Sequence, residues 1–294
     1  MNLGYYPGCS LTGTAKEYDA SLREVLSSFG IQFNEINDWS CCGATSAHAT
    51  NYLLSIALPA RNLLLAKHQG MEEIFAPCAA CFNRLISSKH ELEINKNIKL
   101  KVEDLYTDKF DSSPEVINVV QLFLQHIGLK EISTKKKIDL SNLKIACYYG
   151  CLLLRPRQIL EFDDNEDPQM MEEIITAAGA KAVKWDFKTE CCGASHTIAN
   201  TEIVENLSRK IIENAAVNKA DLIVVACPMC HSNLDMRQKN ILKHNPGHKE
   251  IPVLYLTQLV GLAIGIDYSK LGLNLHFINP LPLLNSKLKK EVGT

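Results

Sequence analysis

The sequence predicts an α/β protein made of two similar repeats, each a small parallel sheet flanked by helices, related by a pseudo-two-fold axis. Short apolar runs rich in β-branched residues alternate with longer segments of helical spacing, as in parallel α/β sheets. One order of cysteine motifs occurs twice in the 294 residues. Each copy closes on a matching apolar segment, residues 116–128 and 253–265, with Gln121 and Gln258 in register.

Four short apolar runs are predicted strands. Residues 3–6 and 145–149 each end shortly before a lone cysteine, and residues 73–76 and 222–226 each end beside a CxxC motif. Ligand sites in open parallel sheets lie beyond the carboxyl ends of the strands. We therefore expect the cysteines that follow these strands to converge on one site in each half.

Six longer segments are predicted helices. They span residues 14–29, 51–68 and 115–127 in the first half, and 170–178, 201–219 and 252–264 in the second. Gly30, Gly70 and Gly179 follow three of them as expected C-caps. The polar, lysine-containing stretch 131–142 is typical of an exposed linker. We therefore expect two domains, residues 1–134 and 142–294.

Composition narrows the function classes. A net charge of −2 gives no reason to expect nucleic-acid binding. The longest apolar run, residues 253–266, contains polar residues and is too short for a membrane segment. The first residues lack the basic and apolar regions of a secretory signal, so we expect a cytoplasmic protein. In that reducing compartment, clustered cysteines more often bind metals or act catalytically than form structural disulfides.

Ten of the eleven cysteines form one five-cysteine pattern that is used twice. Each copy has a lone cysteine, then an adjacent pair followed by glycine, then a CxxC motif. The first copy comprises Cys9, Cys41, Cys42, Cys78 and Cys81, and the second comprises Cys151, Cys191, Cys192, Cys227 and Cys230. Cys147 stands outside the pattern, and we expect it to be a small buried apolar side chain that metal binding does not need.

Five thiols per copy favour a polynuclear centre. Thiolates select zinc, copper(I) or iron–sulfur clusters. Structural zinc closes with four ligands, and an ordinary cubane cluster also takes four cysteines. A fifth thiol in each copy therefore favours an iron–sulfur cluster of unusual shape. The glycine that follows each adjacent cysteine pair, Gly43 or Gly193, allows the sharp bend that lets both cysteines of the pair act as ligands. Zinc in one half, or redox disulfides, remain alternatives.

The repeated pattern is similar to the cysteine-rich CCG domain family, and the chain from residue 5 to about 265 resembles the B subunits of the methanogenic heterodisulfide reductases. The resemblance implies an oxidoreductase of methanogenesis that reduces the mixed disulfide of coenzyme M and coenzyme B to two thiols. It implies two noncubane 4Fe–4S clusters facing one substrate cavity. The ten patterned cysteines would hold these clusters, with Cys42 and Cys192 as the catalytic cysteines.

The resemblance also implies partners. These are a ferredoxin-like iron–sulfur subunit and a flavin-bearing subunit of the same complex, together with a hydrogenase or formate dehydrogenase. The chain has no dinucleotide-binding glycine fingerprint, so no flavin is expected in it. The alternatives are an iron–sulfur subunit of another CCG oxidoreductase, of the hydroxy-acid or fumarate/thiol type, and a zinc-stabilised electron-transfer scaffold.

The implied substrate carries sulfonate and phosphate groups, which call for cationic side chains. The substrate-binding candidates lie close behind cysteines in the sequence and are Arg84, Arg155, Arg157 and His231. His48 and His196 follow the two CCG motifs, where a histidine could deliver a proton to a departing thiolate. The competing interpretations are a solvent-facing arginine, and a histidine that hydrogen-bonds to cluster sulfur or to the backbone.

Overall fold

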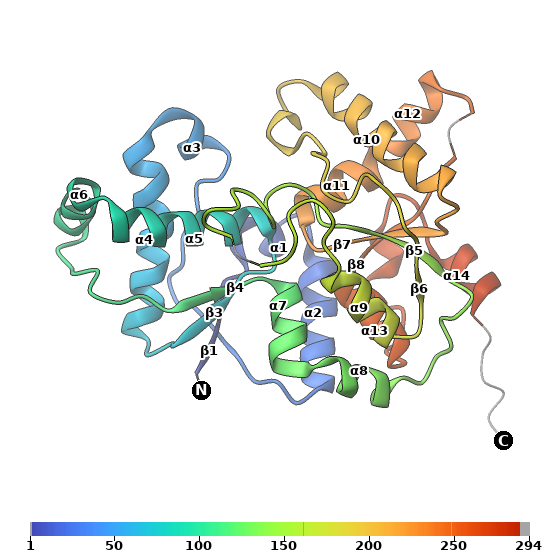
Figure 1. Cartoon of the computed structure of the whole chain (residues 1–294), viewed down its shortest axis with the longest axis horizontal. Coiled ribbons are helices and arrows are strands. Elements are labelled where there is room, and N and C mark those ends of the chain that lie inside the picture. The colour runs from blue at the N-terminus through green and yellow to red at the C-terminus, as the bar shows by residue number, and fades with distance from the viewer. Residues whose placement is uncertain (1, 161, 248, 289–294) are drawn as a thin grey trace.

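A computed structural model describes residues 2–160, 162–247 and 249–288. Met1 and residues 289–294, the outer ends of the two predicted domains, lie outside the described residues. The chain forms two halves that lie side by side, the first coloured blue to green and the second yellow to red in Figure 1. Each half contains a four-stranded parallel sheet flanked by helices. The predicted fold class is therefore confirmed.

The two sheets have the same strand order. In the first half the order is β2–β1–β3–β4, and in the second it is β6–β5–β7–β8. The strands are β1 (Leu3–Tyr5), β2 (Asn34–Glu35), β3 (Glu73–Phe75), β4 (Glu115–Ile117), β5 (Lys144–Tyr148), β6 (Lys181–Ala182), β7 (Leu222–Val225) and β8 (Val253–Tyr255). Every neighbouring pair is parallel, for example Gly4 opposite Ile74 and Ala146 opposite Ile223. The four predicted strands correspond to β1, β3, β5 and β7, the two central strands of each sheet.

Helices of the first half surround its sheet and form its outer end. They are α1 (Gly8–Thr12), α2 (Lys16–Ser28), α3 (Ser46–Thr50), α4 (Tyr52–His68), α5 (Ala79–Ile94), α6 (Lys96–Tyr106), α7 (Val119–Leu122), the π-helix η1 (Phe123–Ile127) and α8 (Leu129–Lys135). Helices α2 and α4 match their predictions. Gly30 and Gly70 follow them with φ of 73° and 69°, the left-handed conformation expected of glycine after a helix.

Helices of the second half follow a similar plan. They are α9 (Met170–Ala177), the 3₁₀ helix η2 (Ala194–His196), α10 (Thr201–Val217), α11 (Pro228–Met236), α12 (Gln238–His244), α13 (Leu256–Ala263), the 3₁₀ helix η3 (Leu273–Leu275) and α14 (Leu281–Lys287). Helices α9 and α10 match their predictions, and Gly179 ends the first with φ of 93°. The side chain of Asn200 caps α10 by accepting a hydrogen bond from the Ile203 amide.

Two predicted helices start too early. Residues 115–117 and 253–255 are the strands β4 and β8, and the helices begin only after Asn118 and Tyr255. The in-register glutamines explain the switch, because Gln121 and Gln258 accept hydrogen bonds from the backbone N–H groups of Asn118 and Tyr255. Each glutamine thus caps its own helix from the third position. The short edge strands β2 and β6 and the helices that follow each CxxC motif were not predicted.

The segment between the halves is partly helical. Helix α8 extends to Lys135, and its Ile132 is buried, so the exposed linker predicted for residues 131–142 begins later than expected. After the helix, the backbone N–H groups of Lys137 and Ile138 donate to the carbonyl of Ala263. We propose that the domains span residues 1–134 and 142–294, with residues 135–141 connecting them.

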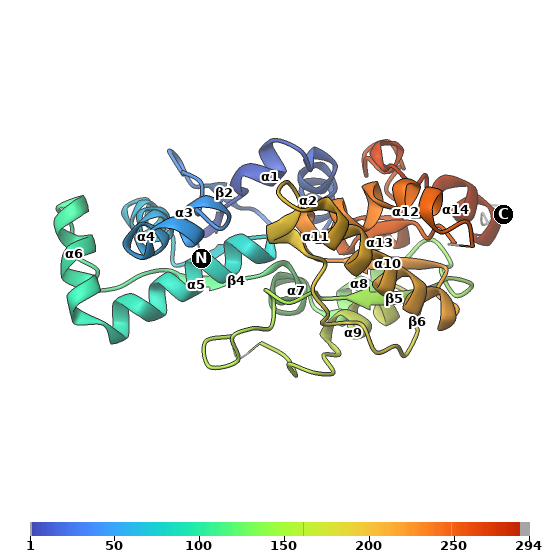
Figure 2. The same cartoon turned by 90° about the horizontal axis from the view of Figure 1, so that it is seen from above.

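A stacked aromatic pair joins the halves. The rings of Tyr18 on α2 and Tyr255 at the end of β8 lie 4.0 Å apart and 5° from parallel. Nearby, the hydroxyls of Ser21 and Thr257 lie 2.7 Å apart. All four side chains are buried, and the helices α2 and α13 that flank them pack together. Figure 2 shows α1, α2 and α11 meeting between the two halves, which share one apolar core.

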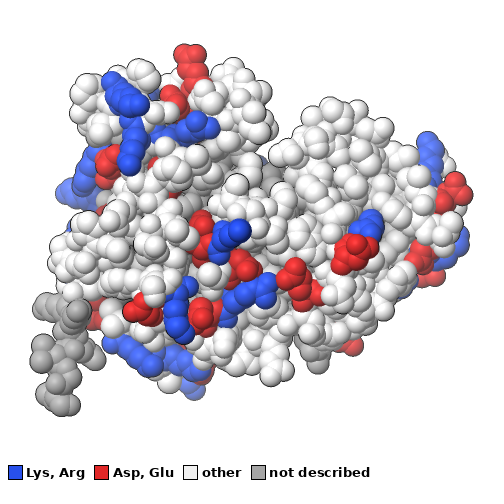
Figure 3. Space-filling view, turned by 180° about the vertical axis from the view of Figure 1, so that it is seen from behind, with Lys and Arg blue, Asp and Glu red and all other residues white. Residues whose placement is uncertain are grey.

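Charged side chains of both signs cover the surface. On the face in Figure 3, Lys and Arg side chains are interspersed with Asp and Glu. Partly exposed ion pairs include Arg23 with Asp19 at 2.9 Å and Arg209 with Glu213 at 2.8 Å. In the part of the chain that the structure describes, no helix is both long and apolar enough to cross a membrane.

The aromatic pair yields a stability prediction. Tyr18→Ala should lower the free energy of unfolding by about 3–5 kcal/mol, because it removes a large side chain buried between the halves. Tyr18→Phe keeps the ring and should cost only about 1 kcal/mol. Urea unfolding followed by circular dichroism measures both. Tyr52→Ala, at a position 58% exposed, is the control and should change stability by less than about 0.5 kcal/mol. An equally small change in Tyr18→Ala would contradict the proposed role of the stack.

Candidate metal centre

The lone cysteines follow central strands of the two sheets. Cys9 lies in α1 just beyond β1, and Cys151 lies in the turn beyond β5. The glycine before each has a left-handed backbone, with φ of 65° at Gly8 and 67° at Gly150. A side chain there would meet the CxxC sulfur, since a Cβ on Gly8 would lie 2.8 Å from Cys81 Sγ. Glycine is therefore required at these positions for the close approach of lone cysteine and CxxC.

The five thiols of the first half form one group. The Sγ atoms of Cys42 and Cys81 lie 3.5 Å apart, and hydrogen bonds link Cys9 to Cys41 and Cys78 to Cys81. The backbone N–H of Gly43 donates to Cys41 Sγ at 3.4 Å. The sequence-distant parts of the pattern are thus brought together as predicted.

The second half repeats this arrangement. The Sγ atoms of Cys192 and Cys230 lie 3.6 Å apart, and those of Cys151 and Cys191 lie 4.0 Å apart. The backbone N–H of Gly193 donates to Cys191 Sγ at 3.3 Å, as its counterpart does in the first half. In addition, Asn233 Nδ2 on α11 donates to Cys192 Sγ at 3.6 Å and to the Cys192 carbonyl at 3.2 Å.

The two groups meet at the boundary between the halves. The thiols of Cys78 and Cys227 lie close enough to shift each other's pKa values, and both residues are buried. At the other ends, Cys9, Cys41 and Cys191 are exposed, and Cys151 is partly exposed. Each group of thiols therefore runs from an accessible end to a buried end, and the buried ends are neighbours.

Hydrogen bonds between thiols shift the pKa values of cysteines in both halves. Hydrogen bonds from Cys42 and Cys9 lower the pKa of Cys41 to about 2. A hydrogen bond from Cys151 lowers the pKa of Cys191 to about 6. Cys9 and Cys151 donate the hydrogen bonds to Cys41 and Cys191. Donating them raises the pKa of Cys9 and of Cys151. The first thiol of each adjacent pair therefore becomes a thiolate, the form that binds metals, more readily than the lone cysteine does. In the second half, hydrogen bonds from Cys230 and Cys78 also lower the pKa of Cys227.

Two tyrosines that were not predicted as site residues hold the loops that carry the cysteine pairs. Tyr6 donates its hydroxyl to the carbonyl of Ser40 at 2.7 Å, and Tyr148 donates to the carbonyl of Glu190 at 2.6 Å. Both tyrosines lie three residues before a lone cysteine, so the repeat itself contained the signal for their matching roles. With backbone N–H groups aimed at sulfur, the ten thiols suit thiolate ligands of a soft metal centre.

Cys147 lies apart from both groups. Its side chain is fully buried in β5, and burial raises its pKa, followed by the charge of Glu172. The patterned cysteines are absent from the charges that act on it. Its position agrees with the prediction of a small buried side chain.

Arg84 and His48 come together beside the first group. Arg84 donates from Nη1 to His48 Nδ1 at 2.9 Å and from Nη2 to Asn83 Oδ1 at 2.8 Å. Burial lowers the pKa of Arg84, and the nearby thiol of Cys42 acts in the opposite direction. Both side chains line a cavity of about 350 Å³ that Tyr52 and His90 also line.

The other two arginines lie among acidic residues. Arg155 pairs with Glu166 at 3.5 Å, and Arg157 lines a separate cavity of about 590 Å³ with Asp163 and Asp164. Neither lines the cavity beside Arg84. His196 lies near the second group, where its charge contributes to lowering the pKa of Cys191.

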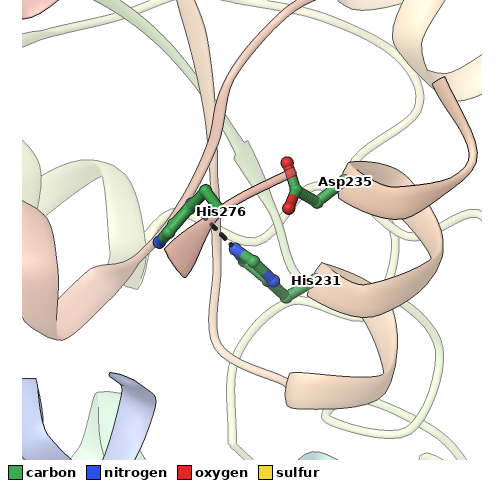
Figure 4. Close-up of side chains that lie close together, drawn as sticks. All are labelled: His231, Asp235 and His276. Atoms are coloured by element: carbon green, nitrogen blue, oxygen red, sulfur yellow. Dashed lines mark hydrogen bonds between the residues drawn. The ribbon is translucent and has the colours of Figure 1, made fainter. Parts of the chain in front are cut away.

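His231 points away from the cysteines into the core. It belongs to a buried trio with Asp235 and His276, whose ligand-type atoms lie within 4.8 Å of one another (Figure 4). Its Nε2 lies 3.0 Å from the carbonyl oxygen of Val253 and 3.3 Å from Nδ1 of His276. The structure thus does not bring His231 to the cavity that Arg84 lines.

Hydrogen bonds give the buried trio a structural role. Gln258 Oε1 accepts from the Tyr255 N–H, so its Nε2 must donate to Nε2 of His276 at 2.8 Å. Burial lowers the pKa of His276 to about 4, so the ring is neutral and carries its proton on Nδ1. An N–H therefore faces His231 where a metal would need a lone pair. Asp235 accepts the backbone N–H groups of residues 277 and 278, which fastens this segment to α11.

Comparison with known proteins agrees with this architecture. The family model described as "CCG: Cysteine-rich domain" matches residues 3–86 and 145–235. A crystal structure of a hypothetical protein from Helicobacter pylori superposes with a TM-score of 0.76 at 13% identity, over 94% of this chain and 51% of that one. The chain thus spans about half the length of that protein, and the likeness concerns the fold alone.

Several curated relatives match over nearly their whole lengths. The 8-methylmenaquinol:fumarate reductase membrane anchor subunit of Wolinella succinogenes is 33% identical over 95% of this chain and 98% of its own length. A protein of Archaeoglobus profundus that is named as similar to the B subunit of heterodisulfide reductase is 26% identical over 92% of this chain and 93% of its own. The B subunit of the ferredoxin:CoB–CoM heterodisulfide reductase of Methanosarcina mazei is 25% identical over 96% and 95%. With both repeats matched by the family model, the chain belongs to the CCG cysteine-rich domain family.

Proposed function

We propose that this chain is the iron–sulfur subunit of a multisubunit oxidoreductase that reduces a small disulfide to two thiols, with the coenzyme M–coenzyme B heterodisulfide as the substrate. The observation that carries the proposal is the pair of matched five-thiol groups that meet at Cys78 and Cys227. Relatives named as heterodisulfide reductase subunits share this chain from end to end and support the choice of substrate.

Each thiol group would hold one noncubane 4Fe–4S cluster. Five soft donors with backbone N–H groups on their sulfurs suit such a centre, and a single tetrahedral zinc would leave one thiol unused. Zinc in one half is the alternative for the metal. Bound clusters would supply single electrons, while cleavage of a disulfide consumes two electrons and two protons. Two groups of ligands with neighbouring buried ends match that demand.

The protein's own residues would position the substrate and supply protons. Tyr6 and Tyr148 fix the loops of the cysteine pairs, so that Cys42 and Cys192 are held at equivalent places. His48 accepts from Arg84 at Nδ1, which leaves its proton on Nε2, where it can donate a hydrogen bond. His196, exposed beside Cys191, is the candidate for delivering protons to the released thiolates.

Electrons would come from partner subunits. We propose a ferredoxin-like iron–sulfur subunit and, behind it, a flavin-bearing subunit, in a complex with a hydrogenase or formate dehydrogenase. The exposed cysteines Cys9, Cys41 and Cys191 would lie on the side where electrons enter. Eleven free thiols call for a reducing compartment, and we therefore place the protein in the cytoplasm.

The second candidate is a subunit of a quinol:fumarate reductase. The specific observation in its favour is the 33% identity to the Wolinella succinogenes subunit, over 98% of that protein. Anaerobic assays of the purified complex separate the two candidates. Oxidation of a reduced low-potential dye by the heterodisulfide supports the first, and oxidation of a menaquinol analogue by fumarate without heterodisulfide reduction supports the second.

Metal content is the first prediction for this site. Anaerobically purified protein should contain about eight iron atoms and as many acid-labile sulfides, because two 4Fe–4S clusters require them. Inductively coupled plasma mass spectrometry and sulfide analysis measure both. About one zinc and half of this iron would show that zinc occupies one half. Zinc alone, without sulfide, would rule the iron–sulfur proposal out.

Substitution of matched cysteines tests the two halves. Cys42→Ala and Cys192→Ala remove equivalent thiols, and each should reduce heterodisulfide turnover at least about a hundredfold, because the positions are proposed to act in the reaction itself. Cys147→Ala is the matched control, and it should keep the full iron content and activity. Circular dichroism must show that the variants are folded, since metal loss can unfold a dependent domain. Near wild-type turnover in a folded Cys42→Ala variant would limit the chemistry to the second half.

A further inference from the structure

We propose that Arg84 is an oxyanion-binding residue that recognises a sulfonate, phosphate or carboxylate group of the substrate, and that it fixes which half of the protein receives the anionic end. The proposal rests on the proposed function for the reaction, while the anion site itself rests on the geometry around Arg84.

Arg84 is held in place by neutral partners. Its Nη1 donates to His48 and its Nη2 to Asn83, so two of the five N–H donors of the guanidinium are used. Asn83 is anchored in turn, because its Nδ2 donates to the carbonyls of Leu152 and Arg155 in the second half. A guanidinium that is already oriented loses less entropy when it binds an anion.

Among the residues that the structure describes, no carboxylate forms an ion pair with Arg84. The ionisable group that acts on its pKa is the nearby thiol of Cys42. The other two arginines near the cysteines differ, since Arg155 pairs with Glu166 and Arg157 acts on Asp164. Keeping a half-buried guanidinium without an acidic partner costs free energy, and a bound anion would offset this cost.

The second repeat has no cation at the position that matches Arg84. Arg84 lies three residues after Cys81, and the residue three after Cys230 is Asn233. Asn233 is satisfied internally, because it donates to Cys192 and its Oδ1 accepts from Thr197. The residue six after Cys42 is His48, and the residue six after Cys192 is Ile198. At these two matched positions the first half thus has a cation and an imidazole, and the second half has an amide and an apolar side chain.

A cavity gives the anion access to Arg84. The cavity of about 350 Å³ is lined by Arg84, His48, Tyr52, His90 and Glu91, together with Ile159 of the second half, and Glu91 accepts a hydrogen bond from Tyr52. Three aromatic or imidazole rings around one guanidinium suit a short organic oxyanion. Such a group can bind the remaining N–H donors of Arg84 and the Nε2–H of His48 together.

Direct binding tests the site without turnover. Wild-type protein, purified with its metal, is titrated calorimetrically with 2-mercaptoethanesulfonate and with the neutral thiol 2-mercaptoethanol. The sulfonate should bind at least about tenfold more tightly, and Arg84→Asn, which installs the residue of the second half, should remove this preference. Arg209→Asn, on the outer face of α10, is the matched control and should keep it. Titrations with inorganic phosphate and succinate show which oxyanion the site prefers.

Kinetics provide a second measure. Arg84→Asn should raise the KM for the anionic heterodisulfide about tenfold with little change in kcat, and should leave the KM for bis(2-hydroxyethyl) disulfide unchanged. Equal affinity of wild type and Arg84→Asn for all three anions would overturn the anion site, even in an active enzyme. Loss of iron in Arg84→Asn would also overturn the anion site, because it would show that Arg84 balances the charge of the thiolate ligands and does not serve to bind an anion. If wild type reduces no disulfide yet shows the Arg84-dependent preference, the proposed reaction fails and the site stands.

Discussion

Parallel pairing of β1 with β3 and of β5 with β7 is the constraint on which the rest of the structure depends. Parallel neighbours end at the same edge of a sheet, so the lone cysteine after one strand and the CxxC motif after the next lie together although far apart in sequence. An antiparallel pair would put them at opposite ends. Gly8 and Gly150 complete the arrangement, since any side chain there would collide with the CxxC sulfur.

The stacked pair of Tyr18 and Tyr255 brings the two edges to each other. The hydroxyl of Tyr18 lies 3.3 Å from the carbonyl of Pro77 and 3.5 Å from that of Ala226, the residues that directly precede Cys78 and Cys227. One buried side chain therefore contacts both CxxC loops. A movement of one half against the other would change the contact between the two groups of thiols, so packing at this interface and the geometry of the site are coupled.

Duplication gives equal ligands to both halves, and the neighbouring side chains then make them different. The thiols, the tyrosines that hold their loops and the glycine N–H donors all occur in matched pairs. The difference lies one helical turn beyond the CxxC, where the first half has Arg84 and the second has Asn233. A symmetric scaffold with an asymmetric surround suits a substrate whose two ends differ in charge.

The sequence by itself determined the fold class, the four central strands and the grouping of ten cysteines. These depend on local periodicity and on a repeat, both of which are visible in one dimension. The sequence-based prediction was wrong at residues 115–117 and 253–255, which are strands and not the start of helices. A short apolar run before a helix has no local mark that separates strand from helix until a neighbouring strand pairs with it. Only the tertiary structure decided that His231 faces the core and that Arg84 meets His48, whereas Arg155 pairs with an acid. Proximity in sequence to a cysteine could not decide this, because the direction of a side chain depends on the helix that carries it and on what packs against that helix.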